Sequence, residues 1–202
     1  MKLLVLGTRN EGKRRELEIL LAPYDIELKT LKDIPQSIEV EETGTTFAEN
    51  ARLKAVEQAK VLNQWVLGED SGLSVDALKG DPGVYSARFA GEHGNDEANN
   101  DLLLEKLANV PAPKRWAGYT CAICLSDPEG NVQFECMGEC RGKILTARKG
   151  TAGFGYDPLF ELAEYHQTFG ELGDAIKSVL SHRARAMRIF ARDFGGFAAA
   201  TA

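Results

Sequence analysis

The sequence lacks the features that mark membrane, secreted or nucleic-acid-binding proteins. Its apolar stretches run for only a few residues, far short of the roughly 20 that a membrane-spanning helix needs, and no basic-then-apolar signal segment opens the chain. Basic residues are outnumbered, 24 against 30 acidic ones, and the net charge of −6 argues against a sequence-independent grip on nucleic acid. We therefore expect a cytoplasmic protein with no membrane partner and no nucleic-acid partner.

Cysteine is also scarce, with Cys121, Cys124, Cys136 and Cys140 as its four residues. Their C-x2-C and C-x3-C spacings occur in zinc sites. The first pair, however, belongs to the strand-like segment 119–125, and residues three apart on a strand point to opposite faces. We therefore favour buried, reduced thiols over a zinc site.

What remains is an ordinary globular composition. The chain has 202 residues, of which 44% are hydrophobic, and this is enough for one sizeable core. No internal repeat, low-complexity segment or linker divides the chain. We therefore expect one domain over residues 1–202, with room for two lobes.

Hydrophobic periodicity and turn residues predict the order of strands and helices. Strands are expected near residues 2–7, 26–31 and 65–67, followed by a β-meander over 117–145 with its turn at 127–131. Helices are expected over about residues 13–21, 46–62, 96–107 and 174–194, and the tail after Gly195 is expected to fray. This mixture predicts an α/β fold around a mixed sheet.

The most informative segment is GEDSGL, residues 68–73. The apolar run before it predicts a buried strand that ends at two adjacent carboxylates, Glu69 and Asp70. Neighbouring buried carboxylates repel each other and lose hydration, so a divalent cation or a shared proton is the simplest way to neutralise them. A solvated turn is the alternative, because Asp, Ser and Gly are common turn residues.

A second segment, GTRNEGK at residues 7–13, lies where a strand is expected to lead into a helix. It has the G-x4-G-K spacing of a phosphate-binding loop, but Arg14 stands where a P-loop needs Ser or Thr to hold magnesium. A true P-loop is therefore disfavoured. Asn10 and Lys13 beside a helix N-terminus can still bind a polyphosphate, and a turn with a solvent-facing Lys13 is the alternative.

Three further segments carry candidate chemistry. Glu39, Glu41 and Glu42 precede a predicted helix and offer carboxylates for magnesium, or else an exposed acidic face. The glycine-rich segment GTAGFGYDP, residues 150–158, has aromatic rings that can stack on a base, or else forms a tight turn. The last helix carries Lys177 and, after Ser181, a His-Arg pair that can donate to phosphate or base, or else lie in solvent.

Six segments occur together in a familiar order: GTRNEGK, EETGTTFAENARLKA, EDSGL, GDPGVYSARFAG, GTAGFGYDPLF and SHRARA. With them the chain resembles the inosine/xanthosine triphosphate pyrophosphatases over residues 4–191. The resemblance implies a two-lobed single domain around a long mixed sheet flanked by helices, with the substrate cleft between the lobes, and a homodimer. It also implies magnesium-dependent hydrolysis of ITP, dITP and XTP to the nucleoside monophosphate and pyrophosphate, which removes these nucleotides from the pool.

The same resemblance implies roles for individual residues. Asp70 becomes the general base, and the implied Mg²⁺ ligands are Glu42, Glu69 and Asp70. The purine is recognised by residues Phe154, Gly155, Tyr156, Asp157, His182 and Arg183. The triphosphate is held by residues Thr8, Arg9, Asn10, Glu11, Gly12, Lys13, Ser71 and Lys177.

A water activated at Asp70 would then attack in line, and pyrophosphate would leave with its charge held by magnesium and lysines. Donors near the six position would favour the oxo group of hypoxanthine and xanthine over the amine of adenine. Two alternatives stay open at this point: a phosphate-monoester hydrolase, and a nucleotide-sensing module without turnover.

Overall fold

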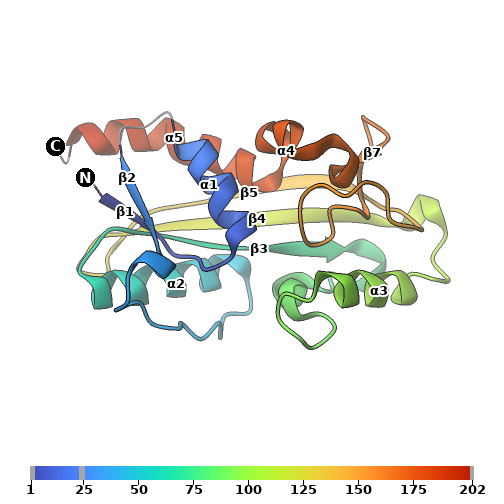
Figure 1. Ribbon diagram of the computed structural model, residues 1–202, viewed down its shortest axis with the longest axis horizontal. Coiled ribbons are helices and arrows are strands. Elements are labelled where there is room, and N and C mark those ends of the chain that lie inside the picture. Colours follow the sequence, from blue (N-terminus) through green and yellow to red (C-terminus); the bar gives the residue numbers. More distant parts are fainter. Residues whose placement is uncertain (1–2, 23–25, 201–202) are drawn as a thin grey trace. The chain divides into compact units, whose positions relative to one another are not determined.

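The computed structural model describes residues 3–22 and 26–200 of the chain (Figure 1). Within these residues a mixed sheet of seven strands is flanked by helices, in the order β2-β1-β3-β4-β5-β6-β7. The strands are β1 (Leu3–Leu6), β2 (Glu27–Thr30), β3 (Val66–Val75), β4 (Trp116–Ser126), β5 (Val132–Ile144), β6 (Phe160–Leu162) and β7 (Gln167–Thr168). Strand β1 pairs in parallel with β2 and β3, whereas β6 pairs antiparallel with β5 and β7. The predicted α/β class with a mixed sheet is confirmed.

The helices among the described residues are α1 (Glu11–Leu21), α2 (Phe47–Leu62), α3 (Asp96–Lys106), α4 (Phe169–Leu180) and α5 (His182–Ala200), with short 3-10 turns at Leu31–Asp33, Asp76–Leu78, Gly83–Arg88 and Ala112–Lys114. Helix α2 starts with a capping box in which Thr46 and Glu49 bond each other's backbone. None of the described helices combines the length and apolarity needed to cross a bilayer.

The chain forms two compact units. Unit 1 comprises Met1–Asp70, Cys121–Gly138 and Arg183–Ala202, and unit 2 comprises Ser71–Thr120 and Glu139–His182.

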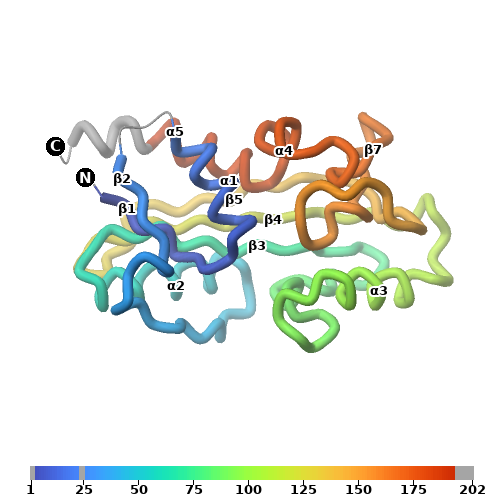
Figure 2. Tube along the Cα trace, in the orientation of Figure 1, coloured from blue at the N-terminus to red at the C-terminus, as the bar shows by residue number. Residues whose placement is uncertain are grey.

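In unit 1, α2 packs on one face of its strands while α1 and α5, which are far apart in sequence, lie side by side on the other (Figures 1 and 2). Leu67 of β3 packs with Leu17 of α1 and Met187 of α5. Its neighbour Val66 packs with Ala59 of α2. The side chains of β3 therefore alternate between the two faces.

In unit 2, one apolar core joins β3 and β4 to the segments that follow them. Helices α3 and α4 lie on either side of the unit's strands (Figure 1). The core includes Leu103 of α3, Tyr156 of the glycine-rich loop and the rings of Phe160 and Phe169, which stack with centroids 5.6 Å apart. This loop is therefore anchored in the core by its own aromatic residue.

The prediction that a strand ends at the two acids is wrong, and so is the alternative of a solvated turn. Strand β3 continues through Glu69 and Asp70 to Val75, and both acids are buried, at 1% and 5% exposure. The turn-forming residues indicated an end to the strand. The strand continues because each buried carboxylate pairs with a basic side chain.

The single helix predicted over 174–194 is also wrong at one point. Ser181 has an extended backbone (ψ 162°) that ends α4, and α5 begins at His182. The predicted start at residue 174 coincides with a kink, since Gly173 has φ 72° inside α4. Helix α5 continues to Ala200, beyond the point where fraying was expected.

Candidate active site

The predicted phosphate-binding segment, residues 7–13, forms the turn from β1 and the start of α1. Asn10 caps α1, and its Oδ1 accepts a hydrogen bond from the Lys13 amide at 3.0 Å. The Thr8 hydroxyl in turn accepts one from the Asn10 amide at 3.1 Å. A capped helix start with Lys13 in its first turn is a favourable environment for an anion.

Two side chains of this segment are engaged elsewhere. Arg9 donates to the Ser37 hydroxyl at 3.1 Å. Glu11 accepts hydrogen bonds from Lys32 and Arg14, which lower its pKa to about 2. The assignment of residues 8–13 to the triphosphate stays a prediction, and the structure favours the amides and Lys13 over these two side chains as its carriers.

The two acids of β3 point to opposite faces of the strand, as adjacent strand residues do. Glu69 meets residues of α1 and α5, whereas Asp70 meets residues of α2. Electrostatic repulsion between the carboxylates is therefore relieved by separate cations. Single-ion chelation by both side chains is disfavoured, and Glu69 as a metal ligand stays a prediction.

Glu69 is neutralised by the guanidinium of Arg183. Arg183 donates from Nη2 and Nε to the two Glu69 oxygens, at 2.9 and 3.2 Å, and also pairs with Glu16 of α1. The Lys13 ammonium lies 3.5 Å from Glu69. Burial alone would lower the pKa of Arg183, but the carboxylates of Glu69 and Glu16 outweigh it and raise that pKa well above its ordinary value.

Asp70 is neutralised by Lys54, a residue that the sequence analysis missed. The Lys54 ammonium lies 2.8 Å from Asp70 Oδ1 and 2.7 Å from Glu42 Oε1, so it bridges the two carboxylates. Asn50 adds a weaker donor 3.4 Å from Asp70 Oδ2. Burial raises the pKa of Asp70 above its ordinary 3.8, and Lys54 opposes this shift only in part.

A glycine allows this contact. A Cβ built on Gly68 would lie 2.3 Å from the Ala51 carbonyl oxygen of α2, so only glycine lets α2 approach β3 this closely. The available sequence signal for Lys54 was its place on α2, four residues after Asn50 and next to the buried Ala55. A lysine beside a stripe of alanines lies at the edge of the buried face.

In unit 2, the glycine-rich loop of residues 150–158, which is predicted to recognise the base, is held by an ion pair. We call it the base-recognition loop. Asp157 Oδ2 lies 2.5 Å from the Lys177 ammonium and accepts a hydrogen bond from the Phe154 amide at 2.9 Å. The same ammonium lies 4.1 Å from the centroid of the Phe154 ring. Asp157 and Lys177 are both nearly fully buried, at 1% and 3% exposure. Lys177 therefore supports this loop, and its contact with the triphosphate stays a prediction.

The remaining predicted residues divide between the units. His182 belongs to unit 2, where its ring stacks on Tyr119 with centroids 4.7 Å apart. Arg183 belongs to unit 1, with its guanidinium on Glu69. Ser71 is half-buried in the unit 2 part of β3. The structure brings Glu42 to Asp70, Lys13 to Glu69, and Lys177 to Phe154 and Asp157.

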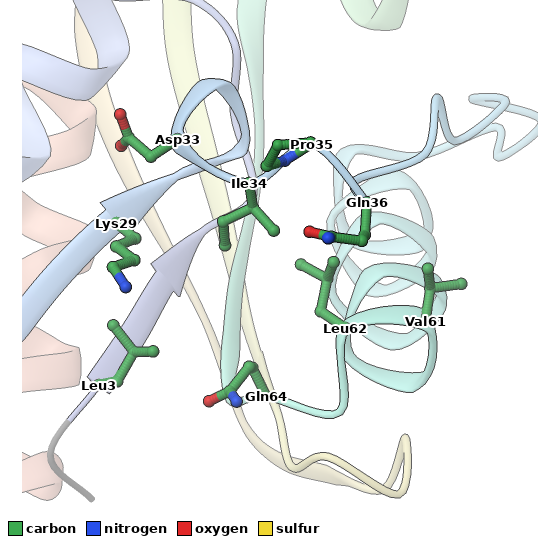
Figure 3. Close-up of a pocket in the computed structure, with 9 residues that line it drawn as sticks. All are labelled: Leu3, Lys29, Asp33, Ile34, Pro35, Gln36, Val61, Leu62 and Gln64. Carbon is green, nitrogen blue, oxygen red and sulfur yellow. The ribbon is translucent and has the colours of Figure 1, made fainter.

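Other side chains form a hollow that holds none of the predicted site residues. It lies in unit 1 beside the start of β1, the turn after β2 and the end of α2, with Leu3, Ile34 and Leu62 among its apolar lining (Figure 3). Cys121 and Cys124 lie in two different core clusters, which confirms that they face opposite sides of β4.

A mixed α/β fold with buried carboxylates beside lysines, and a capped helix start that carries Lys13, suits an enzyme that acts on anionic substrates. The chain belongs to the Ham1 family, whose model matches residues 4–193.

Named relatives support this membership over nearly the whole chain. A dITP/XTP pyrophosphatase of Rhodopirellula baltica is 59% identical, covering 93% of this chain and 90% of the relative. One of Bacillus cereus is 49% identical, covering 93% and 92%. The solved structure of the Staphylococcus aureus Ham1 protein has a TM-score of 0.86 at 38% identity, covering 96% of this chain and 99% of that one.

Proposed function

We propose that this protein hydrolyses non-canonical purine nucleoside triphosphates, namely ITP, dITP and XTP, to the nucleoside monophosphate and pyrophosphate. Family membership and the relatives named dITP/XTP pyrophosphatase support the reaction and its substrates. The observation that carries the chemistry is the buried Asp70 carboxylate, joined to Glu42 through the Lys54 ammonium. A phosphate-monoester hydrolase and a sensor without turnover are not favoured.

We further propose that Mg²⁺ is the cofactor and that Asp70 and Glu42 hold it. Among the described residues no three His, Cys, Asp or Glu side chains form a ready-made metal site. Two carboxylates that already share one cationic group nevertheless fit an ion that takes a few carboxylates and completes its shell with water and substrate phosphate. When bound, Mg²⁺ would supply charge neutralisation for the phosphates.

We propose Asp70 as the general base. Its carboxylate is largely buried, and burial raises its pKa above the ordinary value, which a bound Mg²⁺ would oppose. In the proposed step, an Asp70 oxygen accepts the proton of the attacking water. Lys54 donates to Asp70 Oδ1 at 2.8 Å and so fixes the direction in which the carboxylate points.

The phosphates would be bound by Lys13 and the amides at the start of α1. Recognition of the purine falls to the unit 2 loop, where the Phe154 ring offers a stacking surface and the main chain and His182 offer polar groups. A donor facing the six position of the purine would favour an oxo group over an amine. We also propose, from the resemblance alone, that the protein is a cytoplasmic homodimer.

A nucleotide panel tests the function. ITP, dITP, XTP, GTP, ATP and a phosphate monoester are incubated with the protein with and without Mg²⁺, and pyrophosphate and orthophosphate are measured separately. We expect pyrophosphate from the first three substrates, and only with Mg²⁺. Orthophosphate from the monoester would favour the phosphatase instead, and equal turnover of ITP and ATP would refute the selectivity.

A further inference from the structure

The backbone of Gly155, in the centre of the base-recognition loop, is held on both sides by α3. The Gly155 amide donates to Asp96 Oδ2 at 2.6 Å. The Gly155 carbonyl accepts a hydrogen bond from Asn100 Nδ2 at 2.9 Å. Asp96 and Asn100 are four residues apart and so lie on the same face of the helix. One face of α3 thus forms hydrogen bonds with both the amide and the carbonyl of a single loop residue.

The amide of Asn100 has only one workable orientation. Its Nδ2 donates to the carbonyls of Gly155 and Asp96, so exchanging nitrogen and oxygen would place an acceptor against two acceptors. In this orientation Asn100 Oδ1 is buried without a hydrogen-bond partner, and the side chain is 1% exposed. The orientation of Asn100 therefore follows from its two donations, and the one to Gly155 joins α3 to the loop.

The two hydrogen bonds from α3 hold a residue whose backbone geometry is unusual. Gly155 has φ 63°, in the left-handed region, and a Cβ built there would meet no atom within 4 Å. No side chain of its own therefore holds it in place. Its neighbour Tyr156 donates from its hydroxyl to the Ser86 carbonyl at 2.8 Å, and Phe154 is tied to Asp157. Gly155 is the residue through which α3 bonds the backbone of this loop.

We propose that Asp96 and Asn100 are positioning residues that set the preference for non-canonical purines by fixing Gly155 between Phe154 and Tyr156. The inference rests on the proposed function, in which this loop recognises the base. Loss of the two hydrogen bonds from α3 would let the peptides on either side of Gly155 rotate. This rotation would shift the Phe154 ring and the main-chain groups that face the purine. The phosphates, bound in the proposal by unit 1, would be unaffected.

Asn99 provides a matched control on the same helix. It is as buried as Asn100, at 2% exposure, but its amide holds the Ala87–Ala90 segment, since it accepts from the Ala90 amide and donates to the Ala87 carbonyl. The variants Asp96→Ala, Asn100→Leu and Asn99→Ala are compared. Steady-state kinetics with dITP and dGTP are measured, together with inhibition by inorganic tripolyphosphate, which has no base.

We expect KM for dITP to rise about tenfold in Asp96→Ala and Asn100→Leu with kcat changed less than about twofold, because binding of the base is weakened without touching the reacting atoms. The preference for dITP over dGTP should fall, and inhibition by tripolyphosphate should be unchanged. The amide proton signal of Gly155 should also move upfield in Asp96→Ala as its hydrogen bond is lost. Asn99→Ala should keep the wild-type preference.

Two results overturn the inference while the proposed function stands: an unchanged KM for dITP in both variants, or an equal loss of dITP and tripolyphosphate affinity. Restoration of the preference in Asp96→Asn, which keeps an acceptor for the Gly155 amide, would support it. A wild-type protein that releases no pyrophosphate from ITP, dITP or XTP overturns the proposed function itself, and this inference with it.

Discussion

Replacement of Lys54 by methionine tests the charge arrangement around Asp70. Methionine keeps much of the length and apolar volume of lysine but removes the ammonium that lies 2.8 Å from Asp70 and 2.7 Å from Glu42. The side chains of Lys54, Asp70 and Glu42 are only 15%, 7% and 24% exposed. The variant therefore leaves two largely buried carboxylates without their shared cation.

The expected cost follows from this burial. Removing one partner of a buried ion pair typically costs 3–5 kcal/mol, and partial exposure of Glu42 places Lys54→Met at the lower end, about 3 kcal/mol. In a domain of this size about 1 kcal/mol corresponds to 2–4 °C, so Tm should fall by about 6–12 °C. The exposed Lys60 on the same helix is the control, and Lys60→Met should leave Tm nearly unchanged.

The pH dependence has a definite sign. Without Lys54, the pKa of Asp70 in the folded state rises further above its unfolded value, so the folded variant binds a proton more readily than the unfolded chain does. The deficit in stability should therefore be largest at neutral pH and shrink as the pH falls. Thermal unfolding followed by circular dichroism between pH 5 and about 8 measures it.

Magnesium provides the second half of the test. If Asp70 and Glu42 hold Mg²⁺, the ion should stabilise Lys54→Met more than the wild type, because it replaces the missing charge. For a Kd of about 1 mM, about 10 mM Mg²⁺ would add roughly 1.4 kcal/mol, or about 3–6 °C. Equal Tm values for Lys54→Met and Lys60→Met, or the same response to Mg²⁺ in variant and wild type, would refute the reasoning.

Three further predictions concern other residues. Asp70→Asn should lower kcat by about 10²–10⁴-fold with little change in KM, as expected for loss of a general base, and near-normal turnover would remove Asp70 from that role. Arg183→Met should cost about 3–5 kcal/mol, measured by urea unfolding, because Glu69 and Glu16 lose their guanidinium, and adding Glu69→Leu should recover part of the loss. The pKa of Glu49 is lowered from its ordinary 4.5, mainly by a hydrogen bond from the Thr45 amide. The stability that this carboxylate contributes is therefore present above its unfolded pKa and is lost as the pH falls through its folded pKa. Glu49→Gln should therefore flatten the acid limb of stability against pH, and an unchanged acid limb would contradict this.

Local signals in the sequence were sufficient for some elements. Helix α2 was predicted at nearly its observed bounds, because alanines at 51, 55 and 59 mark its buried face. Its N-cap is Thr46, one residue after the 43–45 segment expected to cap it. The β4–β5 hairpin followed from alternation and from the turn residues at 127–131. In both cases, the residues that give the pattern in the sequence are the same neighbouring residues that form the helix face or the turn in the structure.

The errors occurred where tertiary partners override local preference. Glu69, Asp70 and Ser71 have low strand propensity, yet β3 passes through them because Arg183 and Lys54, which are distant in sequence, neutralise the two acids. The break at Ser181 has no glycine or proline to announce it. Lys54 was missed for the same reason, since only Gly68 shows how closely α2 approaches the strand.

The alternation of β3 gives the two acids different tasks. Asp70 faces α2, where Lys54 joins it to the partly exposed Glu42, the pair to which our proposal assigns Mg²⁺. Glu69 faces a guanidinium that is itself 1% exposed and is shared with Glu16, an arrangement that desolvation makes costly to break. The same two-residue motif therefore joins one carboxylate suited to changing partners and one suited to holding Arg183, and with it the start of α5, in a fixed place.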